Sequence, residues 1–154
     1  MTSSIDVPGT RGCAFCDYLS GRRPFTVLYR DSVVAALVTR EQRGIGHVLV
    51  IPVAHRPTLL DLEPQEGSAI MALVISSGRA ITDAYKTEGL AVWQNNGIPA
   101  HQAIPHVHFH VAGTLPEGGT EWGHVEEDPV AETDAIGERL RPFLRLPPDW
   151  PVPA

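Results

Sequence analysis

The sequence has few of the features that mark secreted, fibrous or membrane proteins. Only two of its 154 residues are cysteines, which excludes a framework of several disulfides. No apolar run approaches the roughly 18 residues of a membrane helix, and the N-terminus lacks the basic and apolar regions of a signal peptide. The 14 glycines and 14 prolines stay below the content of a low-complexity chain. We therefore expect a cytoplasmic globular domain that does not contact membranes.

Positive charge is also scarce. The chain has 12 lysines and arginines against 18 aspartates and glutamates, so its net charge is −6 with histidine neutral. This balance excludes the broad basic surface of a nucleic-acid-binding protein. The negative charge is concentrated in residues 117–138, which hold eight carboxylates and no lysine or arginine. A small phosphate ligand remains compatible with this distribution.

Composition divides the chain into one domain and two terminal segments. We predict a flexible leader over residues 1–12 and a proline-rich tail over 147–154. The single domain between them covers 13–146, with a core over 13–113 and an acidic C-terminal extension over 117–146.

Hydrophobic patterning predicts an α+β fold with a mostly antiparallel sheet, one long helix and one short helix. The long helix is expected from Pro64 to Tyr85, with the proline in its first turn and Gly89 as its C-cap. A weaker helix is expected over 128–144. Strands are predicted over 25–30, 32–38, 46–52, 90–95 and 105–112.

Histidine is the residue type that stands out. Four of the seven histidines lie within ten residues, at His101, His106, His108 and His110. The last three alternate with Val107, Phe109 and Val111. On a strand this alternation places the apolar residues toward the core and the histidines on the opposite face. Because a neutral imidazole can act as nucleophile, metal ligand or proton carrier, this face is predicted to be a functional site.

The two cysteines form a Cys-x-x-Cys pair at Cys13 and Cys16. In a reducing compartment such a pair is typically metal-binding or redox-active. No strand is predicted before it, whereas a thioredoxin-like redox motif follows a strand. This context favours the metal-binding interpretation over the redox one.

The segment HVHFHV at 106–111 matches the His-x-His-x-His core of the histidine triad (HIT) family. Asn95-Asn96-Gly97 and Gln102 reproduce the family's spacing upstream of the triad, and GHVLVIP at 46–52 resembles the strand before the long helix. The Cys-x-x-Cys pair is shared with the zinc-containing bacterial branch. The chain therefore resembles this family over about residues 13–113.

This resemblance implies a HIT-like fold and a homodimer whose sheets join. It also implies a nucleotide ligand, a purine nucleotide in our prediction, with hydrolysis or transfer at the α-phosphate. The bond cleaved would be a phosphoramidate or a phosphoanhydride. His108 inherits the role of nucleophile, which forms a nucleotidyl-histidine intermediate.

The resemblance also assigns roles to the residues around His108. His110 would contact the phosphate or leaving group and pass a proton. Asn95 and Gln102 would donate hydrogen bonds to phosphate oxygens. Thr39 occupies the position at which many family members hold the ribose with an aspartate, and His101 would add a donor near the phosphate. A serine common after Gln102 is here Ala103, so one phosphate contact is lost.

In the zinc-containing branch, two cysteines and two histidines hold a structural zinc ion. The matching residues are Cys13, Cys16, His55 and His106. This assignment leaves His108 and His110 for chemistry. His47 matches a recurring family histidine, for which a hydrogen bond within the site and a purely structural role stay open.

Two other functions remain to be weighed. A non-catalytic nucleotide-binding or zinc-stabilised interaction module would explain why Ala103 and Thr39 depart from the family pattern. A metal-dependent hydrolase with three histidine ligands lacks the carboxylate that such open sites often contain. It also leaves the cysteines without a role.

Overall fold

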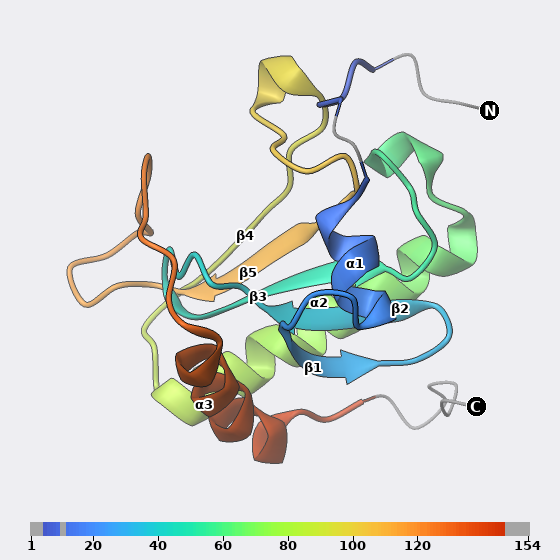
Figure 1. Ribbon diagram of the computed structural model, residues 1–154. Helices are drawn as coiled ribbons and strands as arrows, with labels where there is room; N and C mark the ends of the chain where they lie inside the picture. The colour runs from blue at the N-terminus through green and yellow to red at the C-terminus, as the bar shows by residue number, and fades with distance from the viewer. Residues whose placement is uncertain (1–4, 10–11, 147–154) are drawn as a thin grey trace.

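The sheet is built from the β-branched segments that the sequence predicts as strands. The structure is a computed structural model in which residues 5–9 and 12–146 are described. Five strands lie in the order β1-β2-β3-β5-β4, and each neighbouring pair is antiparallel (Figure 1). Their bounds are β1 Thr26–Arg30, β2 Val34–Val38, β3 Ile45–Pro52, β4 Leu90–Trp93 and β5 Phe109–Gly113.

The α+β prediction is confirmed, but the described residues contain three α-helices where the sequence predicts two. These are α1 (Ala14–Ser20), α2 (Pro64–Tyr85) and α3 (Val130–Leu140), with short 3-10 turns η1 (Leu59–Asp61), η2 (Ile98–Ala100) and η3 (Arg141–Phe143). The helix missed from the sequence is α1. Its seven residues are too few to show an apolar period, and it begins where the Cys13 sulfur accepts the N–H of Cys16.

The long helix has the predicted bounds, Pro64 to Tyr85, with the proline in its first turn. The predicted cap is wrong, because the helix ends at Lys86, which adopts a left-handed φ of 54°. Gly89 serves close packing instead, since a Cβ there would lie 3.0 Å from Thr114. An exposed lysine can take the left-handed conformation at a modest energetic cost.

The last predicted strand begins later than expected, at Phe109 rather than residue 105. Before it, the Val107 N–H donates to the carbonyl oxygen of Arg56, which lies beyond the end of β3. His106 and His108 therefore sit on an irregular segment that is held against the loop after β3.

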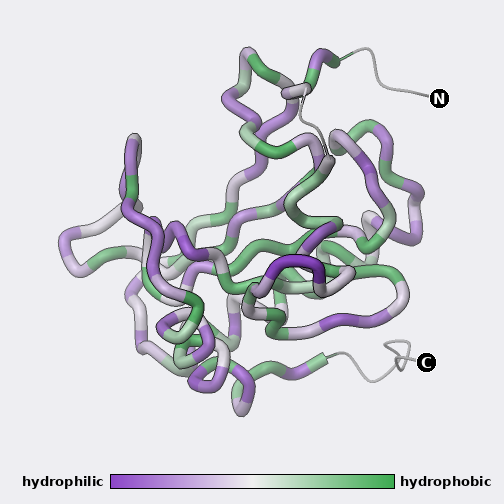
Figure 2. The backbone as a smooth tube through the Cα atoms, viewed as in Figure 1, coloured by the Kyte–Doolittle hydropathy of each residue, from purple (hydrophilic) through white to green (hydrophobic). Residues whose placement is uncertain are grey.

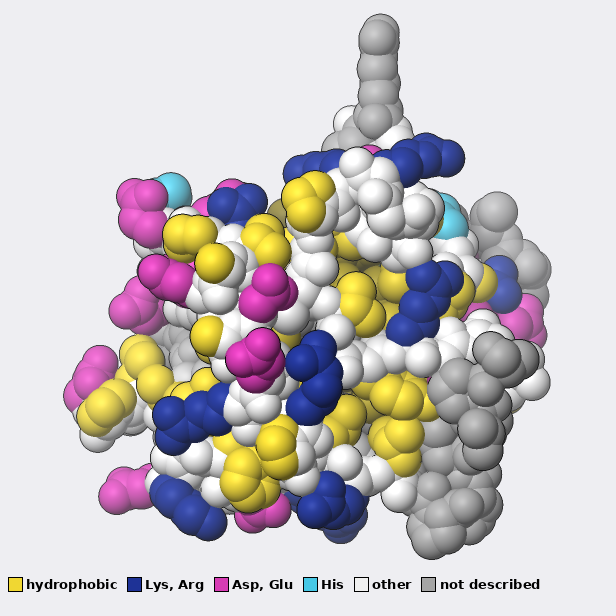
Figure 3. Space-filling model, turned by 60° about the horizontal axis from the view of Figure 1, so that its bottom comes forward, with side chains coloured by type: hydrophobic (Ala, Val, Ile, Leu, Met, Phe, Trp, Pro, Cys, Tyr) yellow, Lys and Arg dark blue, Asp and Glu magenta, His cyan; other side chains and the backbone are white. Residues whose placement is uncertain are grey.

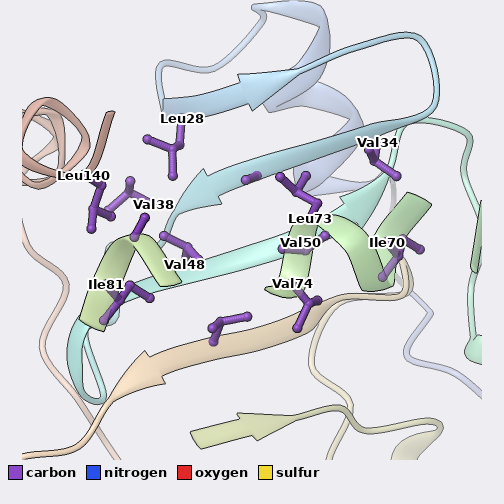
Figure 4. Packing of buried hydrophobic residues seen from close by; sticks show 13 residues of the cluster. Leu28, Val34, Val38, Val48, Val50, Ile70, Leu73, Val74, Ile81 and Leu140 are labelled. Carbon is purple, nitrogen blue, oxygen red and sulfur yellow. The ribbon is translucent and has the colours of Figure 1, made fainter. Parts of the chain in front are cut away.

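Alternating side chains separate the two faces of the sheet. The core consists of two clusters of buried apolar residues, one on each face of the sheet. In the larger cluster, on the α2 face, Val48 and Val50 pack with Leu73 and Ile81 (Figure 4). On the opposite face, a smaller cluster comprises Cys13, Phe15, Ala35, Leu37, Leu49 and Ile51, so α1 packs there. Hydrophobic residues are concentrated along these central strands (Figure 2).

The structure describes part of the predicted leader and none of the predicted tail. Within the predicted leader, the Asp6 carbonyl accepts the Ile98 N–H, whereas the predicted tail 147–154 lies outside the described residues. Across the described helices, none combines the length and the hydropathy needed to cross a membrane. Acidic and basic side chains are interspersed on the surface drawn in Figure 3.

Truncation of Leu73, which is fully buried between α2 and the sheet, tests the packing of the larger cluster. We expect Leu73→Ala to lower the free energy of unfolding by about 2–5 kcal/mol, because it leaves a cavity as well as losing apolar burial. Urea denaturation measures the change. The matched control is Leu60→Ala at a 66% exposed leucine, expected to shift stability by less than about 0.5 kcal/mol. Equal effects of the two substitutions would contradict the packing described.

Candidate functional site

The three alternating histidines lie on the α1 face of the sheet, as predicted. Val107 and Val111 are fully buried, and Phe109 packs against the α2-side cluster. His106 and His108 are also buried, however, because α1 and the loops cover this face. The histidines are therefore enclosed rather than displayed to solvent, which makes each hydrogen-bond partner informative.

The ring of His106 is oriented by a main-chain carbonyl. Its Nε2 lies 2.8 Å from the Pro52 oxygen and donates to it, because a carbonyl can only accept. The Nδ1 lone pair then faces the two thiols, 3.4 Å from Cys13 Sγ and 3.7 Å from Cys16 Sγ. This tautomer is the one that a metal ligand requires.

His108 is oriented in the same way, by the main-chain carbonyl of the residue two positions before it. Its Nδ1–H donates to the main-chain oxygen of His106 over 2.8 Å. The Nε2 atom therefore carries the lone pair. The edge of the Phe15 ring packs against the imidazole with 5.1 Å between centroids. An uncharged imidazole with one nitrogen held and the other unprotonated is suited to nucleophilic attack.

His110 is connected to the main chain through His47, so of the two roles left open for His47 a hydrogen bond within the site is the one present. The Arg43 N–H donates to Nδ1 of His47, which places the His47 proton on Nε2. That Nε2–H lies 3.0 Å from Nδ1 of His110 and donates to it. His110 is therefore a neutral imidazole whose remaining proton is on Nε2. Its ring is stacked on Trp93, with 4.6 Å between centroids and 4° between planes.

Burial keeps these imidazoles uncharged. It lowers the pKa of His106 to about 4, of His47 to about 3 and of His110 to about 2, and it lowers the pKa of His108 as well. Proximity to His108, His47 and Arg43 adds to the shift at His110. The site thus offers lone pairs and N–H donors rather than positive charge.

Four side chains of the described part converge on a site that can hold a metal ion: Cys13, Cys16, His55 and His106. Their ligand atoms all lie within 4.8 Å of one another, and Cys16 Sγ is 3.5 Å from His55 Nδ1. Tetrahedral zinc with its usual bond lengths separates sulfur from nitrogen by about 3.5 Å, so the distances fit. Without a metal, burial raises the pKa of Cys16 to about 11, with a further contribution from Cys13. A cation would offset that cost of ionisation.

Beside the histidines lies a cleft of about 790 Å³. One wall is apolar and is formed by Phe15, Tyr18, Phe25 and Leu49. A second wall is formed by Trp93 of β4 and by Asn95, His101 and Ala103 of the segment after β4, and residues 120–123 and 127 also line the cleft. His108 and His110 lie between them, since His110 pairs with Leu49 on β3 and Trp93 on β4.

The predicted ligand-binding residues all line this cleft, but they differ in what they offer. Asn95 lines the cleft, and its carboxamide makes no hydrogen bond with a described residue. The Thr39 hydroxyl accepts the Glu41 N–H over 3.2 Å and keeps its own proton for a ligand. His101 lies on the exposed rim.

Gln102 does not occupy its predicted role as a phosphate donor. Its Oε1 accepts the Gly97 N–H over 2.7 Å, which fixes the amide orientation. Both Nε2 hydrogens are then used, by the carbonyls of Pro57 at 2.7 Å and Ile104 at 2.9 Å. The buried amide has no donor left for phosphate, so it holds the loop from 97 to 104 in shape.

Several residues of the site were not predicted from the sequence. Phe15 and Trp93 contact His108 and His110 directly, and Arg43 starts the hydrogen-bond chain to His110. Trp93 carries a usable signal, since an aromatic residue on a short strand often packs across from a neighbouring strand. The loop at 120–123 reaches the cleft because the Arg43 side chain donates to Gly123 over 2.7 Å and the Glu121 N–H donates to the Arg43 carbonyl.

Comparison with known proteins places this geometry in a family. The HIT domain matches residues 20–116. The adenosine 5'-monophosphoramidase hnt1 of Schizosaccharomyces pombe is 33% identical over 111 residues, covering 72% of this chain and 78% of that protein. The adenylylsulfatase HINT3 of Arabidopsis thaliana is 32% identical over 99 residues, covering 64% of this chain but 50% of that protein.

A solved structure extends the likeness to the fold. A zinc-bound histidine triad family protein from Mycobacterium smegmatis superposes with a TM-score of 0.75 at 27% identity, covering 88% of this chain and 95% of that one. The match of residues 20–116 to the family, together with the enclosed triad and the neighbouring cysteine pair, leads to one conclusion. The chain belongs to the HIT domain family.

Proposed function

We propose that the protein is a nucleotide hydrolase or transferase that cleaves a phosphoramidate or phosphoanhydride bond at the α-phosphate. The observation that carries this proposal is the hydrogen bond from His108 Nδ1 to the His106 carbonyl, which leaves Nε2 as a nucleophile. Relatives named as an adenosine 5'-monophosphoramidase and an adenylylsulfatase support the same chemistry.

The reaction proceeds in two displacements. The Nε2 lone pair of His108 forms a bond to the α-phosphorus, and the bond to the leaving group breaks with its electrons on the departing atom. Nε2–H of His110 donates a hydrogen bond to that atom. An amine leaving group must also gain a proton, which solvent water supplies as the bond breaks, whereas a phosphate leaves without one. Water then attacks phosphorus, the P–N bond electrons return to Nε2, and a water proton passes to solvent.

The two walls of the cleft suit the two ends of the substrate. The aromatic wall of Phe15, Tyr18 and Phe25 offers stacking surface for a base, and we propose a purine because it has the larger ring. The Thr39 hydroxyl then lies on the ribose side. Asn95, on the other wall, donates to phosphate oxygens.

The proposed metal is zinc, because two thiolates and two imidazoles in a tetrahedral arrangement are typical of closed structural zinc sites. Bound zinc would cross-link α1, the loop after β3 and the first triad histidine. Phe15, between the two cysteines, would thereby be held against His108. The thiols must stay reduced for this purpose, in keeping with a cytoplasmic location.

We also propose a homodimer formed along strand β4, which pairs only with β5 among the described strands. Large apolar side chains are exposed on its α2 side: Leu90 at 43%, Val92 at 48%, Met71 at 48% and Ile75 at 47%. Leu90 also packs close to Gly78 of α2, so these groups form one patch. A second copy pairing along β4 would cover them.

A non-catalytic nucleotide-binding module is the second candidate. The engagement of both Gln102 donors and the lack of a hydroxyl at Ala103 favour it, because two phosphate contacts are missing. Substrate turnover separates the two functions.

Replacement of the nucleophile gives that test. We expect His108→Ala to lower the rate of adenosine phosphoramidate or diadenosine polyphosphate hydrolysis by more than about a thousandfold, since it removes the nitrogen that forms the intermediate. The matched control is His124→Ala, at an exposed histidine paired with Glu126 outside the cleft. Nucleotide binding without turnover in the wild-type protein would support the module instead.

Metal content tests the zinc site. We expect about one zinc per chain in the purified protein and its loss in His55→Ala, with a melting temperature lowered by at least about 5 °C. Elemental analysis and calorimetry measure both. His124→Ala is again the control and should retain the metal. A metal-free wild-type protein that gains no stability on zinc addition would overturn this assignment.

The oligomeric state tests the β4 interface. We expect Val92→Lys to convert a dimer to a monomer in analytical ultracentrifugation, because it buries a charge at the centre of the patch. Leu60→Lys, which adds the same charge at an exposed site away from β4, should remain dimeric. A wild-type monomer at micromolar concentration would contradict the interface.

A further inference from the structure

His101 adopts a backbone conformation that most side chains avoid. Its φ is 65° and its ψ is 31°, at the end of the short turn η2. Lys86 is the other non-glycine residue with positive φ in the part of the chain that the structure describes. Glycine would take this conformation without steric cost. This conformation caps the turn, with the His101 N–H donating to the Ile98 carbonyl over 2.9 Å, so it is the place of the side chain at the rim of the cleft that points to a role.

The imidazole of His101 is available to a ligand. It lines the cleft, it is exposed, and it makes no hydrogen bond or ion pair with residues 5–9 or 12–146. The cap is held by the backbone N–H of His101, and the side chain adds no hydrogen bond or ion pair to it within those residues. A bound ligand is the partner that the geometry leaves for it.

The position of His101 indicates which part of a substrate it meets. Cross-strand pairing puts Leu49 and Trp93 on opposite sides of His110. With the base against the aromatic wall on the Leu49 side, the leaving group departs toward the Trp93 side. Of the residues that form that wall, His101 is the only one with an imidazole, which can donate a hydrogen bond to a phosphate oxygen.

The hydrogen bonds of His110 favour a particular kind of leaving group. The Arg43 N–H and the His47 Nε2–H keep Nδ1 of His110 as an acceptor, so the ring is a neutral donor rather than an imidazolium acid. A phosphate needs no proton to depart, whereas an amine does. This arrangement therefore suits an anionic phosphate leaving group.

We propose that His101 is a specificity-determining residue that donates a hydrogen bond to the leaving-group phosphate, which makes nucleoside phosphoanhydrides preferred over phosphoramidates. This inference rests on the proposed hydrolase function and deepens it. The bond between the α-phosphorus and the bridging oxygen breaks as His108 Nε2 bonds to phosphorus. The electron pair stays on that oxygen, which becomes part of the departing phosphate next to His101.

Variants at position 101 separate the imidazole from the backbone. His101→Gly removes the side chain at a position where glycine is favoured, and His101→Ala removes the imidazole while it keeps a Cβ. We expect both to lower the ratio of kcat/KM for diadenosine tetraphosphate to that for adenosine phosphoramidate by roughly three- to tenfold. His101→Arg, which restores a donor for phosphate, should recover much of the ratio, and His124→Gly should leave it unchanged.

The melting temperature distinguishes a ligand-binding role of His101 from a structural one, because loss of a structural side chain would lower it. We expect the melting temperature of His101→Gly to be equal to or above that of the wild-type protein, because the strain is relieved. A lower melting temperature with an unchanged kcat/KM ratio would show that His101 is structural and would overturn the inference.

Binding measurements distinguish this inference from the proposed function. In the His108→Ala background, where no intermediate forms, calorimetry compares ADP with AMP, which lacks the second phosphate. We expect His101→Gly to reduce the preference for ADP by roughly three- to tenfold. If that shift occurs although the wild-type protein turns over no substrate, the hydrolase proposal fails and the phosphate site stands. If turnover is present and neither ratio changes, His101 has no part in specificity; binding of neither nucleotide would overturn both.

Discussion

The site depends on how His106 is held. Its ring donates to the Pro52 carbonyl, its other nitrogen faces the two thiols, and its own carbonyl accepts from His108. One buried residue therefore connects the end of β3, the cysteine pair and the candidate nucleophile. Any movement of the main chain at this point would change the tautomer and direction of the next histidine as well as the metal site.

A chain of hydrogen bonds fixes the tautomer of His110, as main-chain carbonyls fix the tautomers of His106 and His108. It begins at the Arg43 N–H and passes through the buried ring of His47. Because every donor and acceptor along it is assigned, the protonation state of His110 follows from geometry as well as from burial. The turn between β2 and β3 thus fixes, through His47, which nitrogen of His110 carries the proton.

The same turn receives the acidic C-terminal extension. Arg43 donates to Gly123, and Arg40 pairs with Glu127 at 3.1 Å, which brings part of the extension to the cleft. Much of the net charge of −6 therefore belongs to a segment that completes a wall of the site. The negative charge of the chain and its proposed phosphate chemistry are compatible, because three arginines, Arg23, Arg40 and Arg43, line the cleft along with the acidic side chains.

Local sequence patterns were sufficient for the long helix, the antiparallel strands and the alternation that puts the triad opposite the core, since each depends on spacing along the chain. They were not sufficient for α1, which is too short to show a period, or for Gln102, whose amide is used up by three backbone groups of its own loop and the neighbouring one. The residue types at the site were visible in the sequence, including the cysteines, His55 and the triad. Which nitrogen carries each proton, which donors remain free, and the strain at His101 were decided by the tertiary structure, because these properties depend on carbonyls and side chains that are brought together only when the chain folds.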